Sequence, residues 1–172
     1  TAGNLICRGI GALKGRDYRS SLVHSLVSGS FASSVENPRT EFDWLSTDPS
    51  VVDAYCADPL SGTQFSVGAA LTGMVAEAVS KKSAASVPSN LPMLFISGEE
   101  DPVGSLGKGV NKAVALYQHQ GVQDVEEILY PGMRHEILNE PGKLAVFSDV
   151  ESWLTQHAIL RSINQEKKSE NS

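Results

Sequence analysis

The sequence predicts an α/β fold, and the order of elements in its second half leads to this prediction. Residues 91–97 form a short apolar run closed by a glycine, as expected for a strand buried on both faces of a parallel sheet. A helical pattern at residues 105–120 follows, then a strand at residues 125–130 and a helix at residues 143–160. Because consecutive parallel strands need a crossover between them, this alternation is typical of α/β proteins. The polar residues beyond 160 predict a frayed tail.

The first half of the chain predicts helices and loops instead of strands. Residues 4–35 contain short apolar patches separated by glycines, without a regular strand or helix period. A helix start is clear at Asp48-Pro49, because aspartate caps a first turn and proline fits inside it. Residues 68–79 are apolar, with a four-residue spacing that predicts another helix. Residues 81–89 are rich in serine, alanine and proline, and predict a linker.

Length, composition and charge favour one globular domain without a transmembrane segment. The chain has 172 residues, of which 41% are hydrophobic and 20% are charged, as in ordinary soluble domains. Its formal net charge of −6 disfavours nucleic acid as a partner, since phosphate binding depends on clustered Lys and Arg. No apolar run approaches the roughly 20 residues of a membrane span, and no signal peptide is visible. We therefore expect a cytoplasmic protein.

Cysteines and histidines are not arranged as a metal or disulfide framework. Cys7 and Cys56 form no C-x-x-C pair and predict free thiols. His24, His119 and His157 have no other Cys or His near them in the sequence at the spacing that zinc sites use. We therefore expect surface or packing roles for these three histidines. The sequence thus predicts no metal and no organic cofactor.

Two loops carry candidate catalytic residues. In open α/β sheets, functional groups lie just past the carboxyl ends of the strands. Asp101 lies in the loop after the first predicted strand, and His135 in the loop after the second. Each residue alone has an ordinary explanation, since an aspartate before a proline is most often a turn or cap residue. Together they could form a hydrogen-bonded pair in which the carboxylate orients a histidine general base.

Several stretches resemble one family of serine hydrolases. Residues 91–104 (LPMLFISGEEDPVG), 130–140 (YPGMRHEILNE) and 149–154 (DVESWL) are similar to the last third of the group that contains monoacylglycerol lipases, lysophospholipases and serine aminopeptidase-like α/β-hydrolases. Residues 42–46 (FDWLS) and 52–55 (VDAY) resemble the helical cap of bacterial members. The resemblance implies a partial α/β-hydrolase fold, namely a helical cap plus the last strands and helices of a parallel sheet. It also implies that Asp101 is the triad acid and His135 the triad base.

The resemblance implies three regions along the chain. Residues 1–57 correspond to the cap or lid, residues 58–158 to the carboxy-terminal section of the hydrolase core, and residues 159–172 to a polar tail. Apolar cap side chains are expected to form a roof over an acyl chain, although such residues more often simply pack a core. The expected substrate-binding residues are Phe42, Trp44, Leu45 and Tyr55.

The nucleophile motif of this family is missing from the sequence. In the α/β-hydrolase fold the triad serine precedes the acid and the base and lies in a G-x-S-x-G elbow. Ser105 comes nearest, but Val103 replaces the first glycine, and this serine lies between the acid and the base. We therefore expect the elbow and the oxyanion hole to belong upstream of Thr1, and the chain alone to be inactive.

Two classes of function follow. The resemblance implies a carboxylic ester hydrolase that acts on a monoacylglycerol or lysophospholipid. Its expected partners are this small-molecule substrate and the missing amino-terminal section or a second copy of the chain. The alternative is a non-catalytic binding or interaction module, since the elbow is absent. An activity probe for serine hydrolases distinguishes the two, because only a complete triad is labelled.

Overall fold

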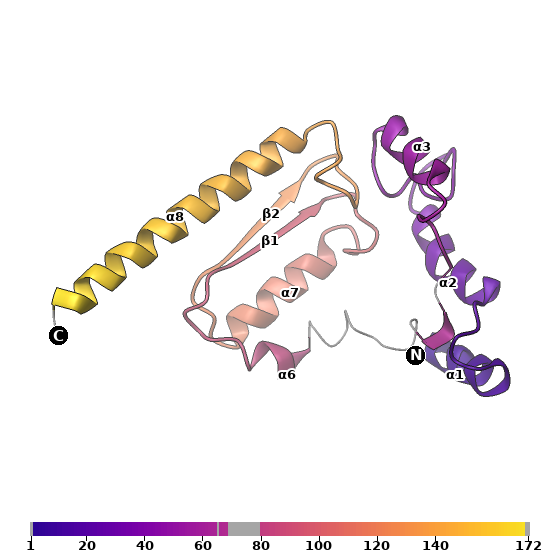
Figure 1. The fold of residues 1–172 in the computed structure, drawn as a ribbon, viewed down its shortest axis with the longest axis horizontal. Coiled ribbons are helices and arrows are strands. Elements are labelled where there is room, and N and C mark those ends of the chain that lie inside the picture. The colour runs from indigo at the N-terminus through magenta and orange to yellow at the C-terminus, as the bar shows by residue number, and fades with distance from the viewer. Residues whose placement is uncertain (1, 65, 69–79, 171–172) are drawn as a thin grey trace.

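The structure is a computed structural model that describes residues 2–64, 66–68 and 80–170. Helices come first along the chain, and two strands follow in the second half (Figure 1). The elements, in chain order, are α1 (Ala2–Lys14), α2 (Ser21–Ala32), α3 (Pro49–Ala57), α6 (Lys81–Ala84), β1 (Met93–Gly98), α7 (Lys108–His119), β2 (Val125–Tyr130) and α8 (Lys143–Glu170).

β1 and β2 form a parallel sheet, as the sequence predicts. The strands are in register from Met93 opposite Val125 to Gly98 opposite Tyr130, and α7 is the crossover between them. β2 has the predicted bounds, whereas β1 begins two residues later than predicted. Because the pairing is parallel, the loops after both strands leave the sheet at the same edge.

Apolar residues pack on both faces of the sheet, which explains why β1 is apolar from Met93 to Ile96. On one face, Phe95 packs against a cluster that includes Tyr117 of α7. On the other face, Ile96 and Ile128 pack against Val146 of α8, which is fully buried. Neighbouring strand residues point to opposite faces, so one apolar run supplies both clusters. Figure 1 shows α7 and α8 on opposite sides of the strands.

The helices of the first half form a separate layer. α1 and α2 pack against each other through a small cluster made of Cys7, Val23 and Val67. Asp48 caps α3 as predicted, since its Oδ1 accepts the N–H of Ser50 at 2.9 Å. α3 lies beyond the carboxyl ends of the strands in Figure 1. In the part of the chain that the structure describes, no helix has an apolar stretch long enough to cross a membrane.

Two predictions about the segments around β1 are wrong. Residues 81–89 begin with the short helix α6 and are not simply a linker, because Ser80 Oγ accepts the N–H of Ser83 at 3.2 Å and caps this turn. α7 begins at Lys108 and not at Ser105. The φ angles of Ser105 and Leu106 are both 54°, outside the right-handed helical range, so a turn precedes the helix.

The end of the chain also differs from its prediction. α8 continues to Glu170, whereas a frayed tail is predicted beyond residue 160. Residues 161–170 contain neither glycine nor proline and are rich in Arg, Gln, Glu and Lys, which favour a helix. The helix predicted at residues 68–79 lies almost entirely outside the described residues.

Candidate active site

The two loops after the strands bring Asp101 and His135 together. Gly98 and Tyr130 end their strands as direct neighbours in the sheet, so the loops that follow start side by side. Asp101 Oδ2 lies 3.1 Å from His135 Nδ1. The predicted geometry of this pair, with both side chains at one sheet edge, is therefore confirmed.

Asp101 is held in place by its own loop. Its side chain is buried, and its Oδ1 accepts the backbone N–H of Val103 at 2.8 Å. Ser97 Oγ lies 3.5 Å from Oδ2 on the strand side. Burial opposes ionisation of Asp101, but the hydrogen bonds with His135 and with the loop backbone outweigh it and lower the pKa of the carboxyl. Asp101 therefore presents a fixed, charged carboxylate to the imidazole.

His135 is oriented by Asp101 and remains accessible. The hydrogen bond to Asp101 raises the pKa of His135, burial opposes this, and the charges of Asp101 and Glu136 add to the rise. The side chain of His135 is 39% exposed. Within the described residues, Nε2 of His135 has no hydrogen-bond partner. An imidazole held at Nδ1 with a free Nε2 is arranged to accept a proton from an incoming group.

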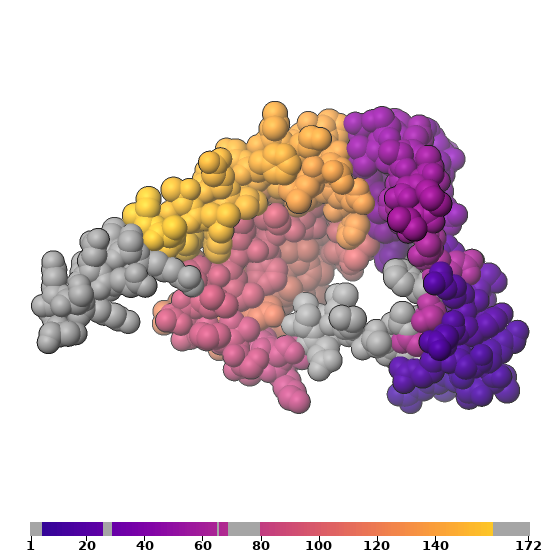
Figure 2. Space-filling model, in the orientation of Figure 1, coloured from indigo at the N-terminus to yellow at the C-terminus, as the bar shows by residue number. Residues whose placement is uncertain are grey.

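The segment before α3 packs against the loop that carries His135. The Trp44 ring lies 5.3 Å from the His135 ring, measured between centroids, and the Phe31 ring lies 5.0 Å from Trp44 on the same measure. The Trp44 carbonyl also accepts the N–H of His135 at 3.4 Å. Figure 2 shows the two regions, purple and orange, as one continuous surface. Trp44 is therefore the predicted cap residue that the structure brings to the histidine.

The other predicted substrate-binding residues take part in packing. Leu45 is buried, and the rings of Phe42 and Tyr55 pack against each other with centroids 5.0 Å apart. Tyr55 Oη accepts the N–H of Gly62 at 3.1 Å, which fixes the ring. Among these cap residues, the ring that packs against the His135 ring is that of Trp44, whereas the rings of Phe42 and Tyr55 pack against each other.

The acidic neighbours of Asp101 face solvent, as predicted. Glu99 and Glu100 are both exposed. Glu100 Oε2 lies 3.9 Å from Arg134 Nε. Over the residues that the structure describes, neither Glu99 nor Glu100 is hydrogen-bonded to His135. Ser105 is also exposed and, in the described part of the chain, makes no hydrogen bond to the imidazole.

A buried glutamate next to the site is a residue that the sequence analysis missed. Glu140 is 1% exposed, and its carboxylate accepts hydrogen bonds from Thr47 and from the backbone N–H of Arg134. An acid before Pro141-Gly142 looks like an ordinary turn residue. No local signal separates it from the exposed acids, because its partner Thr47 lies 93 positions away.

A second polar cluster lies at the opposite end of the sheet. Atoms of Asp124, Glu126 and His157 come within 4.8 Å of one another, a spacing at which they could hold a metal ion. His157 is buried, with Nδ1 2.7 Å from the Trp153 carbonyl and Nε2 2.9 Å from Asp124 Oδ2. These contacts fix α8 to the start of β2 and give His157 a packing role, as the sequence predicts. The free thiols predicted for Cys7 and Cys56 are also confirmed.

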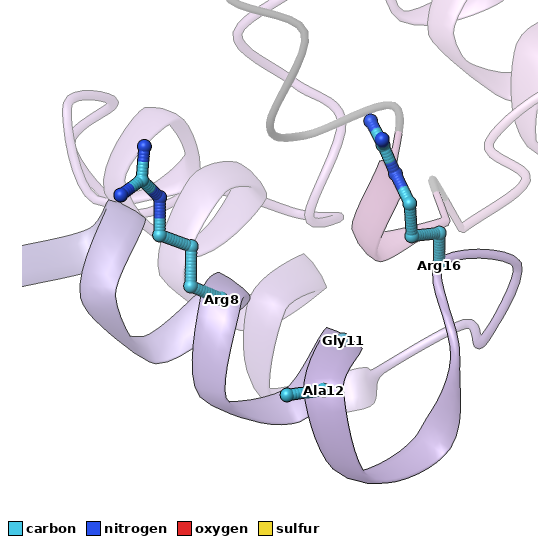
Figure 3. Close-up of a pocket in the computed structure, with 4 residues that line it drawn as sticks. All are labelled: Arg8, Gly11, Ala12 and Arg16. Atoms are coloured by element: carbon cyan, nitrogen blue, oxygen red, sulfur yellow. The ribbon is translucent and has the colours of Figure 1, made fainter.

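The region that the sequence predicts as a cap contains a separate hollow, formed by α1 and the turn that follows it (Figure 3). The guanidinium groups of Arg8 and Arg16 extend on the same side of the helix, with Gly11 and Ala12 between them. This hollow contains none of the residues around Asp101 and His135.

Comparison with known proteins identifies the family. Residues 12–142 match the family described as serine aminopeptidase, S33. The chain belongs to this family. The S33-family chain is 31% identical to the monoacylglycerol lipase of Mycolicibacterium smegmatis over an alignment of 137 residues that covers 76% of this chain and 45% of that protein.

Solved structures share the fold of the S33-family chain. A thermostable carboxyl esterase from Bacillus coagulans, solved with glycerol, has a TM-score of 0.75 at 24% identity, covering 90% of this chain and 50% of the esterase. A lipase in an open form has a TM-score of 0.70 at 28% identity, covering 88% of this chain and 49% of the lipase. The predicted partial α/β-hydrolase fold is thus confirmed, and the chain spans about half the length of the relatives it matches.

Proposed function

We propose that this chain supplies the acid and the base of the catalytic triad of a serine-dependent carboxylic ester hydrolase. The 3.1 Å contact between Asp101 Oδ2 and His135 Nδ1 carries the proposal. In a triad the carboxylate selects the imidazole tautomer whose Nε2 is free, and it stabilises the imidazolium that forms. Membership of the S33 family and the esterases and lipases among its relatives support this chemistry.

In this proposal the nucleophilic serine and the oxyanion hole come from polypeptide outside these 172 residues. Two observations support it: the sequence has no G-x-S-x-G elbow, and the chain spans about half the length of its relatives. Ser105 is a poor candidate because it follows the acid in the chain and, among the described residues, makes no hydrogen bond to His135.

The reaction then follows the two steps of acyl transfer. His135 Nε2 accepts the serine proton as the serine oxygen attacks the ester carbonyl, and it returns that proton to the leaving alcohol. Water then attacks the acyl carbonyl and gives a proton to His135, and His135 passes this proton to the serine oxygen as the bond to the acyl group breaks and the carboxylic acid leaves. Asp101 remains ionised throughout, which agrees with its lowered pKa.

An ester with an apolar acyl chain is the proposed substrate, with a monoacylglycerol or a lysophospholipid as the best candidate. The relative named monoacylglycerol lipase supports this choice, and so do the Trp44 ring beside His135 and the Phe31 ring that packs on Trp44. In the proposal these rings line one side of the acyl-chain path, and Phe42, Leu45 and Tyr55 hold the cap that carries them.

The test is release of fatty acid from a monoacylglycerol and from a lysophospholipid by the protein that contains both this chain and a serine elbow. Wild type should release fatty acid from at least one of them, and His135→Ala should reduce kcat by about four orders of magnitude or more. Activity that survives His135→Ala would contradict the proposed role of the histidine.

One observation favours the alternative of a non-catalytic interaction module. A hollow of about 430 Å³ lies beside α8 and is lined mainly by apolar side chains, among them Ile96, Phe147 and Leu154. Phe147 is 45% exposed and Leu154 56% exposed, so a partner could cover them. An interaction module would bind such a partner. It would not be labelled by a serine-directed probe, even when a segment with a G-x-S-x-G elbow is added to the chain.

A further inference from the structure

Glu140 is the most deeply buried charged residue in the described part of the chain, with 1% of its surface exposed. Its Oε1 accepts the backbone N–H groups of Thr47 at 3.0 Å and of Arg134 at 2.8 Å. Its Oε2 accepts the hydroxyl of Thr47 and also lies 3.1 Å from the Thr47 nitrogen. Burial of a carboxylate away from solvent costs free energy unless hydrogen-bond donors of the protein replace the lost water.

These hydrogen bonds connect two segments that are far apart in the sequence. Thr47 belongs to the cap segment at residues 43–47, and Arg134 directly precedes the histidine. Further bonds run in parallel, from the Glu136 N–H to the Leu45 carbonyl at 2.7 Å and from Arg134 Nη1 to the Asp43 carbonyl at 2.6 Å. The cap segment and the histidine loop therefore form one hydrogen-bonded unit.

The histidine loop needs this external support. Gly132 of the loop has a φ of 69°, which only glycine adopts readily, and His135 itself is 39% exposed. Asp101 holds one side of the imidazole, and the Trp44 ring lies on another at a centroid distance of 5.3 Å. The position of Trp44 depends in turn on the attachment of the cap segment to the loop.

We propose that Glu140 is a positioning residue for His135, because its buried carboxylate fixes the cap segment 43–47 to the histidine loop and so sets the imidazole between Asp101 and Trp44. The inference rests on the proposed function only in taking His135 as the catalytic base. It has a consequence for the lid: residues 43–47 cannot open independently of the histidine, so substrate access depends on other parts of the cap.

The first test is an NMR titration of His135 in the 172-residue chain. In wild type the pKa of His135 lies above its ordinary value, because of the Asp101 contact. Glu140→Gln replaces an acceptor by an amide that faces N–H donors, so the imidazole should leave Asp101 and the pKa of His135 should fall toward its ordinary value. Glu99→Gln, the same substitution at an exposed position, should leave it unchanged.

A second variant, Thr47→Val, tests whether the position of Glu140 matters and not only its charge. It also serves as the test if Glu140→Gln does not fold. Thr47→Val keeps the carboxylate of Glu140 and removes only the hydroxyl donor, so it should lower the pKa of His135 in the same direction. Unchanged His135 titration in both folded variants, even with a lower Tm, would mean a merely structural role and would overturn the inference.

Kinetics then connect the inference to catalysis in the protein that contains the serine elbow. Glu140→Gln should lower kcat roughly 10- to 100-fold and change KM little, since a small misplacement of a catalytic group is enough for such a loss. A wild-type protein that releases no fatty acid would contradict the proposed function, while the titration would still decide the role of Glu140. A change in KM alone would overturn the positioning role.

Discussion

Asp101 and His135 stabilise each other's charged forms, and the stability of the fold should depend on pH through this pair. The pKa of His135 is raised, so its contribution is complete below the unfolded value of about 6.5 and is lost as pH rises through the folded value. The pKa of Asp101 is lowered, so its contribution is present above the unfolded value of about 3.9 and is lost as pH falls through the folded value.

The coupling between the two residues should therefore have a defined pH window. We expect the interaction free energy from a double-mutant cycle of Asp101→Asn and His135→Ala to be largest between about pH 4 and pH 6.5. It should decrease as pH rises beyond the raised pKa of His135. Urea unfolding at a series of pH values measures it, and a coupling that grows steadily toward alkaline pH would contradict the ion pair.

The proposed triad acid, Asp101, can be distinguished from its acidic neighbours by substitution. In the protein with the serine elbow, Asp101→Asn should reduce kcat by about three to four orders of magnitude, because the imidazole loses its orientation and tautomer. Glu99→Gln and Glu100→Gln should change kcat little, since both side chains are exposed. Stopped-flow measurement of acylation compares the three variants. Equal losses would show that Asp101 has no special role.

At the residue scale, the sequence predicts the Asp101–His135 pair but not the buried Glu140 next to it. Asp101 and His135 were predicted because they follow two recognisable strands, and the carboxyl ends of parallel strands meet at one edge. Glu140 was not predicted because its hydrogen bonds reach Thr47, 93 positions away. Such a contact depends on the docking of cap on core, which local patterns do not describe.

At the scale of elements, the loop with the histidine crosses the end of β1 at very short range. A methyl group on Gly98 would lie 2.1 Å from the Arg134 carbonyl oxygen and 2.3 Å from that of Met133. Only glycine therefore permits this crossing. The close approach places Arg134 and His135 directly over the end of the strand that precedes Asp101.

Gly98→Ala should accordingly destabilise the chain by about 1–3 kcal/mol and displace the histidine loop. Gly9→Ala is the matched control, because Gly9 lies inside α1 and its added methyl meets no atom within 4 Å. Alanine at that position should stabilise by about 0.5–1 kcal/mol through helix propensity. Urea unfolding measures both, and equal effects of the two substitutions would contradict the crossing.

Elements with a strong local signal were predicted well. β2 matches its predicted bounds because the strand residues end directly before Pro131-Gly132, which stops the strand. α3 begins as predicted because Asp48 and Pro49 specify its first turn. The start of α7 was misplaced because two non-glycine residues, Ser105 and Leu106, adopt positive φ angles that the sequence does not indicate.

At the scale of the whole molecule, we propose that the chain is one part of a larger fold. It spans about half the length of its relatives, and the apolar hollow beside α8 exposes part of Phe147 and Leu154. In the described residues, no serine hydroxyl is hydrogen-bonded to the imidazole of the Asp101–His135 pair. The central claim is therefore that this chain contributes an acid and a base to a site whose nucleophile is supplied from elsewhere.

The most direct test of this claim is hydrolysis of a medium-chain nitrophenyl ester together with fluorophosphonate labelling. Both are measured on the isolated chain and on the chain refolded with a segment that carries a G-x-S-x-G elbow. The isolated chain should show neither activity nor a labelled serine, because in the proposed function the nucleophile and the oxyanion hole, worth roughly 3–4 kcal/mol per donor, come from polypeptide outside these residues. The refolded mixture should show both, and His135→Ala should abolish both. Labelling of a serine in the isolated chain, at Ser105 for instance, would contradict the account.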